Sequence, residues 1–166
     1  MSKYRNNETS KRNNTMKTQL NYNEHLAEHF TLREMTQSGT ALRENIANIP
    51  TEETVENLRQ LCQHVLEPLR RRFGVLRITS GYRSPELNKA VGGVANSQHM
   101  RGEAADIHCS SLQSARRMYD YARTHLDFDQ LILERRLGNG CCWLHISYVA
   151  QPGHRENRHQ AFWLKV

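Results

Sequence analysis

The spacing of hydrophobic positions changes near residue 75, from a helical period to a strand period. Across residues 51–74 apolar side chains recur every three or four positions, which predicts one long amphipathic helix. Thr51 is a typical N-cap, and Gly74 is typical of the position that ends a helix. Pro68 lies inside this pattern and cannot donate a backbone hydrogen bond, so we expect a kink or break at 64–68.

Shorter patterns on either side predict an α+β fold. The expected elements are a helix at 30–35 capped by Thr31, a strand at 75–80, a helix at 84–91 capped by Ser84 and begun by Pro85, a strand at 103–109, a helix at 111–125, and two strands around the Gly-Asn-Gly turn at 138–140. Alternation places Ala104, Asp106 and His108 on one face of their strand. We expect the tail, residues 152–166, to pack as an edge strand rather than to close over a site.

The chain is expected to divide into a leader and one domain. Residues 1–24 are polar, rich in Asn, Lys and Thr, and lack apolar periodicity, which predicts a flexible leader. Residues 25–166 are expected to form a single domain. The sequence shows neither the apolar run of a secretory signal nor a stretch long enough to span a bilayer. We therefore expect a soluble protein that is made in the cytoplasm.

The formal net charge of +6 narrows the choice of partner only slightly. It favours an anionic partner, such as a cell-wall polymer, a nucleic acid or a membrane surface. The Arg and Lys residues are scattered, however, and no recognition helix or basic-aromatic stripe is recognisable. A nucleic-acid-binding function is therefore disfavoured.

The four cysteines predict reduced thiols. Cys62, Cys109, Cys141 and Cys142 include no CxxC pair, and sequence neighbours rarely bridge each other. Cys142 and His145 do form a CxxH pair, which leaves a metal site at that pair open as an alternative.

The predicted hairpin brings a carboxylate close to an imidazole. A two-residue turn at 139–140 places Glu134 opposite His145. A turn at 138–139 instead places Glu134 opposite Trp143. Because side chains alternate with a period of two, Glu134 and His145 share one face in both registers.

The segment SQHMRGEAADIH, residues 97–108, has the composition of half a metal site. His99 and Asp106 are seven positions apart with Gly102 between them, which suits a turn that lets both side chains converge. Zinc accepts His nitrogen and Asp oxygen together, and His145 is the best candidate for a third ligand. Two His and one carboxylate leave a coordination position for water, as in catalytic zinc sites. Taken singly, each residue is more typical of a surface or a hydrogen-bonded core.

Several motifs together resemble those of the zinc D-Ala-D-Ala carboxypeptidase family. SxHxxGxAxD is present as Ser97, His99, Gly102, Ala104 and Asp106, and WxHxS as Trp143, His145 and Ser147. Ahead of them, SGYRSPELNKAVGGVANSQH is similar to the family's SGYRSxxxNxxVGG element. The resemblance extends from about residue 30 to residue 148. The family includes vancomycin-resistance D,D-dipeptidases, phage endolysin peptidases and the Hedgehog signalling domain, and the chain most resembles its small stand-alone members.

The resemblance implies a fold and a set of site residues. The implied fold is α+β, an antiparallel sheet that carries zinc on one face, with helices packed on the other side. One zinc ion is implied, with three ligands: His99, Asp106 and His145. Arg83 of the GYRS element is implied to bind the scissile carbonyl or a substrate carboxylate. Ser97 is implied as a hydrogen-bonding partner of the substrate or of a ligand, and the motif residues Trp143 and Ser147 are placed in the same group.

One departure from the family concerns the general base. Many relatives carry an acid three residues before the last His ligand, and others carry a His two residues before it. Here these positions hold Cys142 and Trp143, which cannot serve. Glu134 is therefore our candidate for the base, and the alternative is that it only orients His145. His108 is a weaker candidate for a proton-transfer role.

The resulting functional hypothesis is a zinc metallopeptidase of the cell wall. Its expected substrate is a peptidoglycan stem peptide, cut at D-Ala-D-Ala or at a nearby amide bond, by a carboxypeptidase or an endopeptidase. We expect a monomer, and without a visible signal a wall enzyme fits release of the phage-endolysin type. The alternative hypothesis is a non-catalytic, zinc-containing binding module of the same fold.

Overall fold

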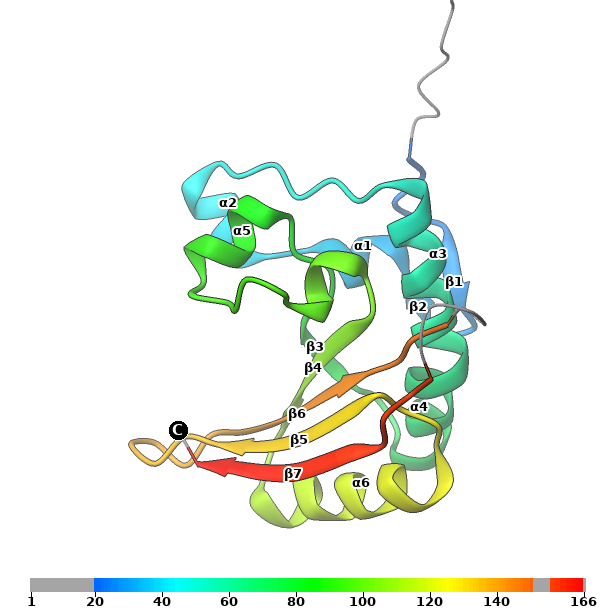
Figure 1. Ribbon diagram of the computed structural model, residues 1–166, viewed down its shortest axis with the longest axis vertical. Coiled ribbons are helices and arrows are strands. Elements are labelled where there is room, and N and C mark those ends of the chain that lie inside the picture. The colour runs from blue at the N-terminus through cyan, green and yellow to red at the C-terminus, as the bar shows by residue number, and fades with distance from the viewer. Residues whose placement is uncertain (1–19, 151–155, 166) are drawn as a thin grey trace, which may run out of the picture.

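The computed structural model describes residues 20–150 and 156–165, in which helices lie on both sides of a five-stranded sheet (Figure 1). The helices are α1 Leu32–Thr36, α2 Gly39–Glu44, α3 Glu52–Leu61, α4 Glu67–Phe73, α5 Pro85–Ala90 and α6 Leu112–His125, with a π-helical turn at Cys62–Leu66 and a 3-10 turn at Gln98–Arg101. The strands are β1 His25–Ala27, β2 Phe30–Thr31, β3 Arg77–Ser80, β4 Ala104–Cys109, β5 Gln130–Arg135, β6 Cys142–Ser147 and β7 Gln160–Lys165.

The main sheet is mixed, which corrects the expectation of an antiparallel one. Its strand order is β3-β4-β6-β5-β7, and β7 runs parallel to β5 while the other neighbours are antiparallel. The chain reverses after β6 and pairs on the outer side of β5. Because β5 is itself antiparallel to β6, β7 has to run in the direction of β5. Within the described part of the tail, β7 is an edge strand, as the sequence predicts.

The long helical segment follows its sequence signals closely. The Thr51 hydroxyl accepts a hydrogen bond from the Thr54 backbone N–H at 3.2 Å and caps α3. Gly74 follows α4 with φ of 83°, a left-handed value that favours glycine. Between these caps the helix widens into the π-helical turn Cys62–Leu66. Helix α4 follows directly, and Pro68 lies in its first turn. The break predicted from the proline is confirmed in this wider turn.

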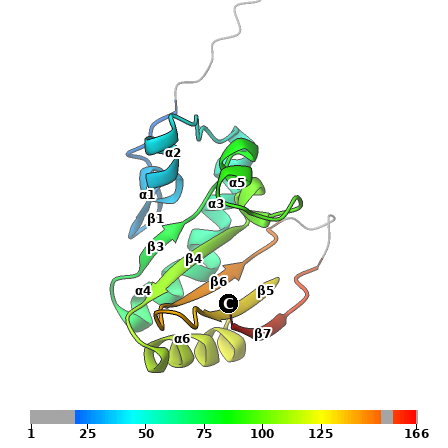
Figure 2. The ribbon, with the colours of Figure 1, turned by 90° about the vertical axis from the view of Figure 1, so that its left-hand side faces the viewer.

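The two faces of the sheet have different surroundings. One face carries the fully buried side chains of Ile107, Leu144 and Ile146, which belong to the same core as residues of α3, α4 and α6. The other face carries polar residues of the same strands, including Asp106 and His145. Figure 2 shows this second face turned toward the viewer, with α3 and α4 behind the strands. Alternation along each strand therefore separates the core from the candidate site.

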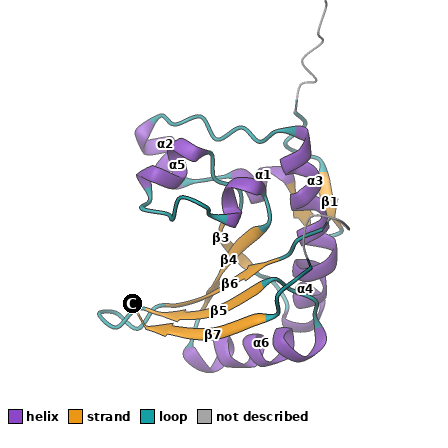
Figure 3. Ribbon diagram, viewed as in Figure 1, coloured by secondary structure: helices purple, strands orange, loops and turns teal. Residues whose placement is uncertain are grey.

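A second group of helices lies on the side of the sheet away from α6. Helices α2 and α5 lie side by side, and Figure 3 shows them across from the strands at the opposite end of the molecule from α6. Both α2 and the small β1–β2 sheet were missed by the sequence patterns. Helix α2 and strands β1 and β2 each contain six residues or fewer, which is too short for a hydrophobic period to be recognisable.

Of the predicted leader, residues 1–19 lie outside the described part of the chain, and Leu20 and Tyr22 pack against the core. The division into leader and domain stays a prediction. All four cysteines are free thiols, as expected. Within residues 20–150 and 156–165, no helix combines the length and the apolar character needed to cross a bilayer.

Candidate metal centre and its cleft

Three side chains from three elements converge at the polar face of the sheet. Asp106 lies on β4, His145 lies opposite it on β6, and His99 comes from the 3-10 turn before β4. Asp106 Oδ1 is 2.9 Å from His145 Nδ1 and 3.3 Å from His99 Nε2. All three candidate ligand atoms lie within 4.8 Å of one another. The predicted convergence of these three residues is thus present in the structure.

A glycine and a carbonyl hold His99 in place. The turn that carries His99 ends at Gly102, whose φ is 73° and whose added Cβ would lie 2.5 Å from the Thr54 carbonyl oxygen. His99 is buried, and its Nδ1 lies 2.7 Å from the Gly81 carbonyl oxygen. That contact requires a proton on Nδ1, so Nε2 is the ring nitrogen that faces the cluster.

Asp106 is anchored on its other oxygen. Its Oδ2 accepts a hydrogen bond from Arg83 Nη2 at 2.5 Å, and Arg83 Nε donates to Ser80 Oγ at 2.7 Å. Burial alone would raise the pKa of the Asp106 carboxyl, but the adjacent His99 and His145 rings outweigh it and hold this pKa well below its usual range. Asp106 is therefore ionised, the state that a metal ligand requires.

A cleft of about 1030 Å³ opens over these three residues. Its floor is the polar face of the sheet, and its opposite wall contains residues of α2 and of the loop after α5. Ser97, His108 and Trp143 line the cleft, as expected of groups near a substrate. Ser147 does not. It is fully buried, and its hydroxyl accepts a hydrogen bond from the Gln130 backbone N–H at 3.0 Å, which ties β6 to β5.

Glu134 also lines the cleft, on the same face as His145. It pairs with Trp143, while His145 pairs with Ile132, so the second of the two predicted registers is present. Burial raises the pKa of the Glu134 carboxyl above its usual range, and the negative charge of Asp106 raises it further. The neighbouring His145, and to a smaller extent Trp143 and Arg83, lower this pKa and partly offset the increase. Glu134 is thus a stronger base than an exposed glutamate.

The hairpin turn itself is longer than predicted. The Arg136 N–H donates to the Cys141 carbonyl oxygen and the Gly140 N–H donates to the Arg136 carbonyl oxygen, each at 2.9 Å. These bonds close a four-residue loop over 137–140 rather than a two-residue turn. Gly140, with φ of 70°, takes the left-handed position of this loop. The register is unchanged because the loop is longer by one residue on each side, so Arg136 and Cys141 remain opposite each other.

The comparison with protein families agrees with the geometry. The sequence pattern of the family described as Peptidase M15 matches residues 28–146, which include all three converging residues and Glu134. The chain belongs to the peptidase M15 family. Peptidases of this family are zinc-dependent metallopeptidases, which confirms the resemblance to the zinc D-Ala-D-Ala carboxypeptidases. No curated protein matches the chain at a significant level.

The side chains of this M15 peptidase fit a zinc ion. Two imidazole nitrogens and one carboxylate oxygen form a donor set that zinc prefers, and they leave a coordination position open. The outer partners are also present, since His99 is held by the Gly81 carbonyl and Asp106 by Arg83. Such partners orient metal ligands in proteins.

The alternative metal pair of the M15 peptidase, Cys142 with His145, is not supported. The two residues are three positions apart on β6, so their side chains point to opposite faces. Cys142 is buried on the core side, in the same cluster as Leu144. For the same reason an acid at position 142 of this strand would face the core and not the cleft.

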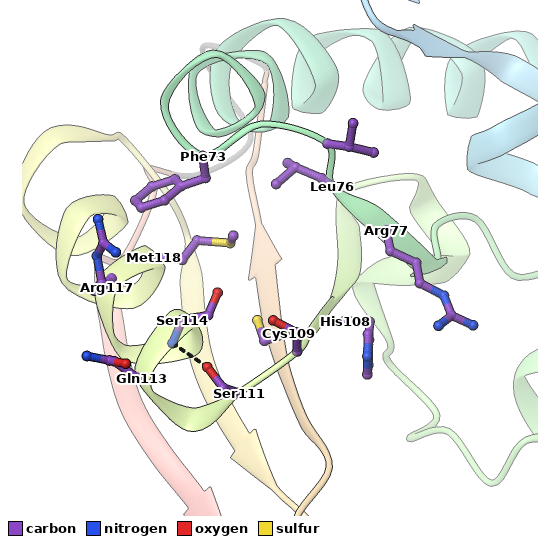
Figure 4. Close-up of a pocket in the computed structure, with 12 residues that line it drawn as sticks. Phe73, Leu76, Arg77, His108, Cys109, Ser111, Gln113, Ser114, Arg117 and Met118 are labelled. Atoms are coloured by element: carbon purple, nitrogen blue, oxygen red, sulfur yellow. Dashed lines mark hydrogen bonds between the residues drawn. The ribbon is translucent and has the colours of Figure 1, made fainter.

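A second cavity lies beyond His108, which borders both spaces (Figure 4). It measures about 540 Å³ and lies between the end of α4, the β3–β4 edge and the start of α6. Figure 4 shows the apolar side chains of Phe73, Leu76 and Met118 on its walls, and the dashed line marks Ser111 capping α6. Its lining contains none of the three converging residues and no carboxylate. This cavity is therefore not part of the candidate metal centre.

Proposed function

We propose that this M15 peptidase hydrolyses an amide bond of peptidoglycan stem peptides, with one zinc ion held by His99, Asp106 and His145. The observation that carries the proposal is the approach of these three ligand atoms to within 4.8 Å on the floor of a large cleft. His99 Nε2, Asp106 Oδ1 and His145 Nδ1 are the proposed ligand atoms. A zinc ion bound there would supply Lewis-acid activation of water and of the peptide carbonyl.

Glu134 is the proposed general base. It faces the cleft beside His145, and its pKa is raised by burial and by Asp106. The carboxylate takes a proton from the attacking water and passes it to the nitrogen of the leaving amine. Proton transfer of this kind contributes typically 10²–10⁴-fold to a rate. Strand alternation keeps the carboxylate on the cleft side of β5, where Glu134 pairs with Trp143.

Arg83 is proposed to have two roles. It holds Asp106 and Ser80 through two of its five N–H groups. The remaining N–H groups of this cleft-lining residue are available for the scissile carbonyl oxygen or for a substrate carboxylate. Ser97 and His108, which line the same cleft, are proposed to contact the substrate on either side of the cluster.

The decisive experiment is mass spectrometry of defined stem peptides incubated with the zinc-loaded protein and with the chelator-treated protein. Zinc-dependent loss of a terminal D-Ala would make the protein a carboxypeptidase, and an internal cut would make it an endopeptidase. Stoichiometric zinc without cleavage of any stem peptide would contradict the proposal and favour a binding module of the same fold.

The role of Glu134 is tested by Glu134→Gln. As a base, Glu134 is required for turnover only, so the variant should lose 10²–10⁴-fold in kcat and keep its zinc. If Glu134 only orients His145, zinc affinity should fall about 10–100-fold instead. Glu86→Gln is the matched control, because this exposed carboxylate lies on α5 and does not line the cleft.

A further inference from the structure

The charges that line the cleft are not balanced. Its carboxylates are Asp106 and Glu134, and its guanidinium groups are Arg43, Arg83 and Arg136. Arg83 is paired with Asp106. Neither of the other two arginines forms an ion pair within the described residues: Arg43 donates to Thr40 Oγ1 at 3.1 Å, and Arg136 lies over an aromatic ring. The lining of the cleft therefore contains one more guanidinium group than carboxylates, and two of its arginines have no carboxylate partner within the described residues.

Arg136 is held more firmly than its exposure suggests. Its backbone N–H and C=O are both hydrogen-bonded across the base of the hairpin loop, to Cys141 and Gly140. Its guanidinium carbon lies 5.7 Å from the centroid of the Trp143 ring, within the range of a cation–π contact. A guanidinium stacked on an aromatic face keeps the N–H groups of its edge available for a planar, bidentate partner.

The position of this group relative to the candidate metal centre is set by the strand. Trp143 is two residues from His145 on β6 and shares its face, so the two side chains are about 7 Å apart along the strand. Across the sheet, Trp143 lies between Glu134 on β5 and His108 on β4. A substrate group bound by Arg136 over this ring would therefore lie about one or two residues along the peptide from an amide bond placed at the three converging residues.

We propose that Arg136, supported by Trp143, binds a carboxylate of the substrate close to the scissile bond. The enzyme would then prefer an acidic peptide to the same peptide with that carboxylate amidated. Charge-assisted bidentate hydrogen bonds of Arg to carboxylate explain the preference, since an amide offers neither the charge nor the second acceptor. This proposal rests on the proposed function, because it names the substrate class of the same cleft.

Arg135 provides a matched control one residue away. It pairs with Cys142 on β6 and with Lys165 on β7, so its side chain lies on the face of the sheet opposite Glu134. It is exposed and does not line the cleft. Arg135→Gln removes the same charge as Arg136→Gln from nearly the same place. A long-range electrostatic effect would appear in both variants, whereas the loss of local recognition would appear only in Arg136→Gln.

The test uses stem peptides in which each carboxylate in turn is free or amidated. Binding is measured by calorimetry with zinc and with chelator, and hydrolysis by mass spectrometry. For the wild type, amidation of one particular carboxylate should weaken binding and raise KM about tenfold. Arg136→Gln should abolish this difference in binding and in KM, and Arg135→Gln should retain it. The carboxylate whose amidation matters, side-chain or C-terminal, identifies the group that is bound.

Three results would overturn the proposal: no preference or no binding by the wild type, an unchanged preference in Arg136→Gln, or an equal loss in Arg135→Gln. The calorimetric arm separates it from the proposed function. A wild-type protein that discriminates the peptides in binding but cleaves none of them would defeat the peptidase and leave the carboxylate subsite intact. Cleavage without discrimination between the peptides would support the peptidase and defeat the carboxylate subsite.

Discussion

Two clusters of histidine and carboxylate groups within the described residues have the spacing of metal ligands, and their surroundings differ. The first contains His99, Asp106 and His145, and the second contains Glu28, His29 and Glu67. The first lies on the floor of the cleft, on the polar face of the main sheet. The second joins the loop between β1 and β2 to the first turn of α4.

In the second cluster each carboxylate already has its cation. Glu67 accepts hydrogen bonds from the His29 backbone N–H at 3.1 Å and from His29 Nδ1 at 2.6 Å. Arg71 lies 2.9 Å from a Glu28 oxygen and 3.4 Å from a Glu67 oxygen. In the first cluster, by contrast, Arg83 binds only Oδ2 of Asp106 and leaves Oδ1 facing both imidazoles. Residue types and spacing alone do not distinguish a metal site from an ion-pair network, but the partners of the carboxylates do.

The largest effect should come from removing one histidine of each cluster. His99→Ala should abolish stoichiometric zinc binding and reduce peptidase activity to background, since two remaining ligands seldom hold zinc. His29→Ala should retain one zinc per chain and the activity of the wild type. Zinc content by elemental mass spectrometry, alongside the peptide assay, measures both. Loss of zinc from His29→Ala with retention in His99→Ala would show that the second cluster, and not the first, holds the metal.

The second prediction concerns the turn that brings His99 to Asp106. Gly102→Ala should lower the free energy of unfolding by about 2–4 kcal/mol, because the new Cβ would lie 2.5 Å from the Thr54 carbonyl oxygen in a left-handed conformation. Gly140→Ala is the control: φ is similar, but nothing lies within 4 Å of its added Cβ. It should cost only about 1–2 kcal/mol. Denaturant unfolding measures the difference, and equal costs would show that the contact with Thr54 does not matter.

The third prediction concerns the pH dependence of the ion-pair cluster. Burial by itself raises the pKa of the Glu67 carboxyl, but hydrogen bonds from His29 and the charge of Arg71 outweigh burial and lower this pKa. A lowered folded-state pKa adds stability above the ordinary pKa of a glutamate, and that stability is lost as the pH falls through the lowered value. Glu67→Gln should therefore cost about 1–3 kcal/mol at pH 7.

The cost of Glu67→Gln should then shrink as the pH falls from the ordinary pKa of a glutamate to the lowered pKa of Glu67. In that range the unfolded chain is protonated first, and the folded wild type loses its carboxylate charge only at the lower value. Thermal unfolding of both proteins between pH 3 and pH 8 follows the change. A cost that does not vary with pH would mean that Glu67 contributes by packing and not by its charge.

The smallest effect is expected for the cation of the second cluster. The Arg71 side chain is 65% exposed, so solvent screens its pairs with Glu28 and Glu67. Arg71→Gln should cost less than about 1 kcal/mol in the free energy of unfolding and should leave zinc content unchanged. Zinc binding by this variant beyond one ion per chain would show that Arg71 is what excludes a metal from the second cluster.

The sequence by itself determined the local elements and the faces of the strands. The Thr51 cap, the break before Pro68 and the end at Gly74 were all predictable, because each depends on hydrogen bonds or backbone angles within a few residues. The shared face of Glu134 and His145 was predictable as well, since alternation fixes it for any simple hairpin. Residue chemistry and spacing already suggested His99, Asp106 and His145 as a metal site, and the motif resemblance implied the same three residues as ligands.

Only the tertiary structure decided which groups meet across the chain. Arg83 and Asp106 are 23 residues apart, and their bond depends on how the β3–α5 loop packs against β4. The parallel direction of β7, the place of Arg136 over Trp143 and the ion pairs of Glu67 depend in the same way on distant packing. Local backbone geometry determines the hydrophobic period of an element and the face on which a residue lies. The contacts of that residue depend on how elements far apart in the sequence pack together, and no local sequence pattern contains that information.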